Sequence, residues 1–220
     1  MGEPSSTSEE RMFEALGKSN IGIVFTLFGL ILPGLSSEDA AAPAQKTQPS
    51  SVRNLKPDGE TRFRTKFFEV SIPFANTQEL ENGGQRKEQR DELSGDYSCT
   101  LYLAPPQSHP SVTVRLKGWE GVNNVEQAHE HWTTGSLRDT DQVVGQVPNS
   151  YFKPGTKSRA TLLHFTPPDA VLVYFTKEIP DFGCVVGIVD VNPRADRKEL
   201  MELSAKIIDS VNFIGPKNQK

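Results

Sequence analysis

The chain has 220 residues, of which 35% are hydrophobic and 24% are charged, so it is long enough for one globular domain with additional segments. Residues 1–44 hold two of the 24 basic and six of the 28 acidic side chains, and the remainder is therefore close to neutral. Because nucleic-acid binding depends on accumulated lysine and arginine, this balance argues against nucleic acid as the main partner.

The first feature in chain order is an uncharged apolar run at residues 21–35. As a helix it would reach roughly 22 Å, which is short of the ~30 Å hydrocarbon core that a membrane-spanning helix must cross. Pro33-Gly34 and the alanines at 40–42 and 44 match the breaker and cleavage region of a secretory signal peptide. We therefore expect export to the periplasm or the exterior with cleavage. The alternatives are an uncleaved membrane anchor, which would be the chain's only membrane contact, and a buried core helix.

Charge and proline placement bear on the start of the signal sequence and on its cleavage point. Acidic residues outnumber basic ones before the apolar run, whereas signal peptides usually begin with positive charge, and a start at Met12 instead of Met1 would reduce this excess. Pro43 disfavours cleavage directly before it, so the predicted mature chain begins at Gln45. Residues 1–44 are thus predicted to be a signal peptide or a membrane anchor.

A flexible linker is predicted at residues 45–62, where Pro, Ser, Gln and Lys are frequent. A single α+β domain follows at residues 63–214, and residues 215–220 form a tail. The domain opens with a strand at residues 67–74, in which apolar and polar residues alternate. Residues 75–96 carry a charged block of mixed sign and are expected to be a solvated loop.

The middle of the domain contains two further strands and a helix. The strands are predicted at residues 97–104 and 112–119, and the second of them alternates between an apolar and a polar face. A short amphipathic helix is predicted from Val122 to Trp132 and should end near Gly135. A weaker strand at 142–147 and a turn segment at 151–158 come next in the chain.

The last third of the domain contains three apolar runs, at residues 160–165, 170–175 and 184–191, rich in β-branched and aromatic residues. Turn residues separate them, so they are predicted to form consecutive hairpins. The middle run does not alternate with polar residues, which places it inside a sheet with both faces covered.

A final helix is predicted after the third run, capped by Asn192-Pro193 or by the cap-like pair Asp196 and Glu199. Its apolar residues fall on one stripe. Short connections require antiparallel pairing, so the predicted fold is α+β: an antiparallel sheet of about six or seven strands with helices packed on it, as in an α/β sandwich. One core is expected to include Val171, Val173, Val186, Ile188, Leu203 and Ile207.

Cys99 and Cys184 are the only cysteines, and both lie in predicted strands. An exported protein could join them by a disulfide if the two strands are neighbours, because the Cα atoms must lie within about 7 Å. Two separately buried thiols are the alternative.

His129 and His131 are weak candidates for a metal site. On a helix, residues i and i+2 point in nearly opposite directions, and a chelating pair needs i and i+4 spacing. We therefore expect neither a metal nor a cofactor, and the sequence contains no recognisable catalytic motif.

A partner-binding rim is predicted from Trp119, Tyr151 and Phe152, because aromatic residues with a polar group are favoured in recognition surfaces. Trp119 ends a strand, directly after Gly118 and two residues before Gly121, and the other two lie in a turn segment. Alternatively, these aromatic side chains cover the core and the strand ends.

Four features occur in order along the domain: an F-x-V-x-I-P strand at residues 68–73, the central helix, the run GCVVGIVDV at 183–191 and the closing segment AKIIDSV at 205–211. In this order of elements the chain resembles the PsbP-like family, whose fold is shared with the Mog-type Ran-binding proteins. The likeness covers about residues 63–214. The resemblance implies a non-enzymatic accessory or binding protein, in bacteria often exported, with no metal or ligand site to carry over.

The sequence therefore favours an exported, non-catalytic accessory or binding protein, which could assemble with a larger membrane-associated complex through an unidentified protein partner. The alternative is a hydrolase or metal-dependent enzyme whose site is assembled from distant residues.

Overall fold

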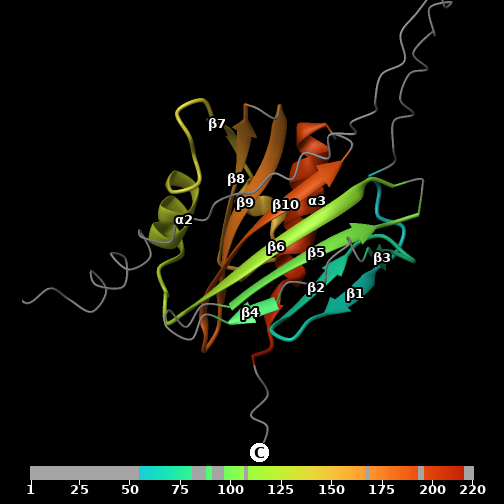
Figure 1. Ribbon diagram of the computed structural model, residues 1–220, viewed down its shortest axis with the longest axis horizontal. Helices are drawn as coiled ribbons and strands as arrows, with labels where there is room; N and C mark the ends of the chain where they lie inside the picture. The colour runs from blue at the N-terminus through green and yellow to red at the C-terminus, as the bar shows by residue number, and fades with distance from the viewer. Residues whose placement is uncertain are drawn as a thin grey trace, which may run out of the picture. The chain divides into compact units, whose positions relative to one another are not determined.

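The structure, a computed structural model, describes residues 55–80, 88–90, 97–106, 109–166, 169–192 and 196–215. Within these ranges the strands form an eight-stranded and a three-stranded sheet, both antiparallel, and helices pack on them, which confirms a mixed α+β class (Figure 1). The large sheet has the order β3-β5-β6-β10-β9-β8-β7, and β4 pairs with β5. Its strands are β3 (Gln78–Glu79), β4 (Glu88–Arg90), β5 (Tyr97–Ala104), β6 (Ser111–Glu120), β7 (Gln142–Gln146), β8 (Ser158–Phe165), β9 (Ala170–Ile179) and β10 (Gly183–Asn192).

The predicted strands of the large sheet are found close to their expected positions. Consecutive strands β8, β9 and β10 pair as two hairpins, as predicted. Strand β9 lies between β8 and β10, and helices pack against it from both sides. The continuous apolar run in β9 is therefore explained by the burial of both faces of this strand.

The small sheet consists of β1 (Thr61–Arg64), β2 (Phe68–Ile72) and β11 (Asn212–Phe213), with β2 in the middle. Only β2 was predicted. The end of the expected linker belongs to the folded domain, because Leu55 is buried and β1 begins at Thr61. The expected solvated loop at 75–96 likewise contains β3 and β4, which pair with β5.

Two helices of the described chain lie on opposite sides of the large sheet: α2 (Val125–Thr134) and α3 (Arg197–Ser210). The end of α2 at Gly135 is as predicted. Asn192 does not cap α3, because it is the last residue of β10 and pairs with Ser111. Asp196 is the N-cap, and its carboxylate accepts a hydrogen bond of 2.8 Å from the backbone N–H of Lys198.

The large sheet has a separate apolar core on each side, since successive residues of a strand point to opposite faces. On the α3 side, Leu162, Val173 and Val189 pack with Leu203 and Ile207 of the helix. On the α2 side, a smaller cluster contains Leu163, Phe165, Tyr174 and Ile188, with Trp132 packed against it. The predicted single core is therefore wrong for Ile188, and for Val186, which points to the same side of β10 as Ile188.

No helix in the described ranges is long and apolar enough to cross a membrane. The apolar run at residues 21–35 lies outside these ranges, as do the rest of the predicted signal segment and residues 216–220.

Candidate functional site

Helix α2 covers one part of the large sheet, packing over β8, β9 and β10. Its N-cap is Asn124, whose side-chain oxygen accepts a hydrogen bond of 3.1 Å from the backbone N–H of Gln127. At its first turn Glu126 accepts hydrogen bonds from the guanidinium of Arg159 on β8 at 2.5 and 2.7 Å. The first turn of α2 is thus tied to strand β8 by an ion pair.

His129 fixes the middle of α2 against the sheet. Its Nε2 lies 2.8 Å from Oγ1 of Thr161, and its Nδ1 lies 3.1 Å from Oγ1 of Thr176. Burial lowers the pKa of His129 to about 4; Glu126 acts in the opposite direction and Arg159 lowers it further. The imidazole is therefore neutral at pH 7, with one ring nitrogen donating to a threonine and the other accepting.

The two histidines proposed as weak metal candidates are used differently. Both ring nitrogens of His129 are within hydrogen-bond distance of threonines, while the ring of His131 lies 6.0 Å from that of Trp119. Among the residues that the structure describes, no group of three or more His, Cys, Asp or Glu side chains is arranged to hold a metal ion.

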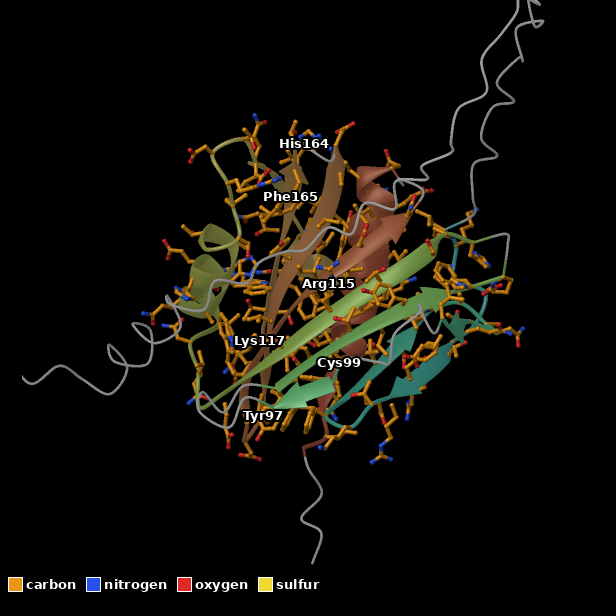
Figure 2. The ribbon with its side chains drawn as sticks, viewed as in Figure 1. Tyr97, Cys99, Arg115, Lys117, His164 and Phe165 are labelled. Carbon is orange, nitrogen blue, oxygen red and sulfur yellow. The ribbon has the colours of Figure 1, made fainter. Side chains whose placement is uncertain are left out.

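Strands β5 and β6 present a polar surface on the α2 side of the sheet, beyond the part that α2 covers. On the opposite side the same strands contribute buried apolar residues, among them Leu101 of β5 and Val114 of β6. We call the six α2-side residues the polar strip, and all are at least partly exposed: Ser98, Thr100, Tyr102, Thr113, Arg115 and Lys117. Arg115 and Lys117 follow one another along β6 (Figure 2).

An aromatic group lies where the polar strip meets α2. The Trp119 ring is 6.0 Å from both His131 and Trp132, and its contact with Trp132 is edge to face. The ammonium of Lys117 lies 5.9 Å from the Trp119 ring centroid, within the range of a cation–π interaction. The indole N–H of Trp132 donates to the backbone oxygen of Gly187 at 3.3 Å. This group joins the end of β6 to α2.

The indole N–H of Trp119 is buried without an acceptor within the described part of the chain. Trp119 is only 3% exposed, and most buried polar groups in proteins have a hydrogen-bond partner. A donor in this state is unfavourable, and it marks the junction between the strip and α2 as a place where an acceptor could bind.

Charges near the strip influence one another across β6, β10 and β9. Burial raises the pKa of Asp190, and Arg115 partly opposes this effect. Burial also raises the pKa of Tyr174, and a hydrogen bond with Ser136 and the charge of Arg115 act in the opposite direction. Among the described residues Arg115 makes no ion pair, so its guanidinium remains available on the exposed face.

The predicted disulfide is not formed, and both cysteines are buried thiols. Cys99 lies on β5 and Cys184 on β10, with β6 between these strands. The Cys99 side chain packs in the α3-side core, whereas Cys184 is paired in register with Trp119 and faces α2. The strands are therefore not neighbours, and the two side chains point to opposite faces, so the condition for a bridge is not met.

The structure does not assemble the predicted aromatic rim. Trp119 is buried on the α2 side, whereas Phe152 is buried in the α3-side core and Tyr151 packs against that core. The alternative interpretation, in which these aromatic residues cover the core and the strand ends, agrees with their burial.

Sequence reasoning recognised the alternation of β6 but did not treat its polar side as a site. The signal was present, because Thr113, Arg115 and Lys117 alternate with buried residues and lead directly to Trp119. What the sequence did not contain was the position of α2, which brings His131 and Trp132 beside Trp119. No protein-family model matches the chain, and no curated protein or solved structure matches it significantly.

Proposed function

We propose that this chain is an exported, non-catalytic accessory protein that binds a protein partner through the polar strip and assembles with a larger, membrane-associated complex. Export is supported by the apolar run at residues 21–35, with the Pro-Gly pair near its end and the small residues that follow it. The accessory role is supported by the resemblance to the PsbP-like family in the order of strands and helices.

The observation that carries the proposal is the residue content of the strip and its border. An antiparallel sheet often has one solvated face, so polarity alone would not indicate binding. Here the exposed side combines Tyr102 and Arg115 and borders the buried Trp119, and Tyr, Arg and Trp are the residue types that dominate binding energy at protein interfaces. A buried indole N–H without an acceptor lies at the same place.

The rigidity of the surface also supports a binding role. The backbones of β5 and β6 are held by continuous pairing along both strands, and β10 pairs with β6 over its whole length. A surface that is already ordered loses little conformational entropy when a partner binds.

Site-specific photo-crosslinking in the producing cells tests this function. A photoreactive amino acid replaces Thr100 in the strip or, as a control, Lys206, which is exposed on α3 on the other side of the sheet. We expect a discrete protein adduct from position 100 and none of that size from position 206. Absence of an adduct at 100, or the same adduct from both positions, would overturn the proposal.

A further inference from the structure

The side chains of Arg115, Lys117 and Trp119 form a row of donors along one side of β6. Alternate residues of a strand point to the same face and lie about 7 Å apart. Their polar groups are a guanidinium, an ammonium and an indole N–H, and each of these can only donate hydrogen bonds. A ligand that contacts this row would therefore present acceptors to it, and the two positive charges favour negatively charged groups.

Trp119 gives independent support for a missing acceptor. Its N–H has no partner among the described residues although the ring is almost completely buried. The Lys117 side chain lies over this ring, and it is long and unbranched. Trp119 therefore lies at the end of the row beside the Lys117 ammonium, so that a ligand bound by Lys117 would lie next to the indole.

Arg115 defines which anionic group fits. The planar guanidinium can donate two parallel hydrogen bonds to a carboxylate, which gives both strength and orientation. Asp190 lies on the neighbouring strand β10, opposite Thr113, and its charge interacts with Arg115.

The spacing of the row matches an extended chain. In an extended peptide, alternate side chains also repeat at about 7 Å, so acidic residues at every second position would meet Arg115 and Lys117 in turn. We propose that the row Arg115, Lys117 and Trp119 binds an extended acidic segment of the partner protein. This inference rests on the proposed function, and it specifies the chemistry of the partner.

The inference is tested with the purified protein and a hexaglutamate peptide as the probe. The chain has two tryptophans, Trp119 and Trp132, and both belong to the aromatic group, so their fluorescence reports binding at this place. We expect a saturable fluorescence change with hexaglutamate. Neither hexalysine nor inorganic phosphate at the same charge concentration should produce it.

A matched pair of double variants distinguishes binding at the polar strip from a general effect of the protein's positive charge. The variant Arg115→Gln/Lys117→Gln removes two positive charges from the strip, and Arg197→Gln/Lys206→Gln removes two from exposed positions of α3. We expect at least tenfold weaker hexaglutamate binding for the first variant and unchanged binding for the second. Trp119→Phe, measured by calorimetry, should also weaken binding, because the ring remains but the N–H is lost. Thermal unfolding checks that each variant is folded.

Several results would overturn the inference: no hexaglutamate binding, equal loss in both double variants, or equally tight binding of phosphate or of a single-stranded oligonucleotide. The crosslinking result shows whether the proposed function fails as well. If hexaglutamate does not bind but the adduct at position 100 persists, only the acidic chemistry of the partner is wrong. If the adduct is absent as well, the strip is not a binding surface.

Discussion

The Nε2 atom of His129 lies 2.8 Å from the hydroxyl oxygen of Thr161, and its Nδ1 atom lies 3.1 Å from that of Thr176, so one histidine of α2 is held between strands β8 and β9. The two contacts join residues that are 32 and 47 positions apart in the sequence. It also explains why this imidazole is neutral, since burial between the helix and the sheet disfavours its charged form.

The first prediction concerns stability in acid. The pKa of His129 is about 4 in the folded protein and 6.5 in the absence of burial. Between these values the unfolded chain binds more protons than the folded chain, so the free energy of unfolding falls as pH falls from 6.5 to 4. The contribution of His129 to this loss is up to about 3 kcal/mol. Urea unfolding at both pH values measures it.

The variant His129→Gln isolates this contribution because glutamine does not titrate. It should lose less stability than the wild type across the same pH interval. His164→Gln is the matched control, since His164 is partly exposed and pairs with Asp169 at 2.6 Å. Equal pH dependence in the wild type and His129→Gln would show that His129 is not buried as the structure places it.

The second prediction tests the packing of α3. Ile207 is fully buried in the α3-side core. Ile207→Ala should lower the free energy of unfolding by about 2 to 5 kcal/mol, because it removes buried methyl groups and leaves a cavity. Lys206→Ala, at the adjacent exposed position, should cost less than about 1 kcal/mol. An unchanged unfolding midpoint for Ile207→Ala would mean that α3 does not pack on the sheet as described.

The third prediction concerns the cysteines. Burial raises the pKa of Cys184 to about 11, and the charge of Glu178 acts in the same direction. Since the thiolate is the reactive form, Cys184 and the buried Cys99 should not react with a thiol reagent in the native protein. Denaturant without reductant should release two reactive thiols per chain. If none appears, the chain carries a disulfide and the placement of β5 and β10 is wrong.

Much of the fold could be predicted because its main strands carry strong local patterns. The alternation in β6 and the continuous apolar runs of β9 and β10 identified these strands to within a few residues. The short strands β1 and β11 were missed, because they are defined by pairing with β2 and contain almost no periodic signal. Short strands of this kind depend on contacts between residues distant in sequence.

The two-sided core could not be predicted from the apolar runs. In β10, Val189 and Ile188 are adjacent and both buried, yet they belong to cores on opposite sides of the sheet. A run without polar residues hides this division, since it shows no alternation. The burial of Trp119 could not be predicted either. Its environment is created by α2, and no residue near Trp119 in the sequence specifies where α2 crosses the sheet.

The fourth prediction tests export. Intact mass spectrometry of the protein purified from its native source should give a mature chain that begins at Gln45, because the apolar run at residues 21–35 has the breaker Pro33-Gly34 near its end and is followed by a small-residue cleavage region. A mass that still includes residues 21–35 would contradict cleavage and favour the membrane anchor.

The central claim is that the polar strip on β5 and β6 is the binding surface, and one crosslinking measurement tests it most directly. The photoreactive residue is placed at position 100, and the adduct is quantified in three backgrounds: the otherwise unchanged chain, Arg115→Gln/Lys117→Gln, and Arg197→Gln/Lys206→Gln. We predict that the adduct is lost in the strip variant and retained in the α3 variant. An adduct that is equally strong in all three backgrounds, or that is absent from the otherwise unchanged chain, would contradict the claim.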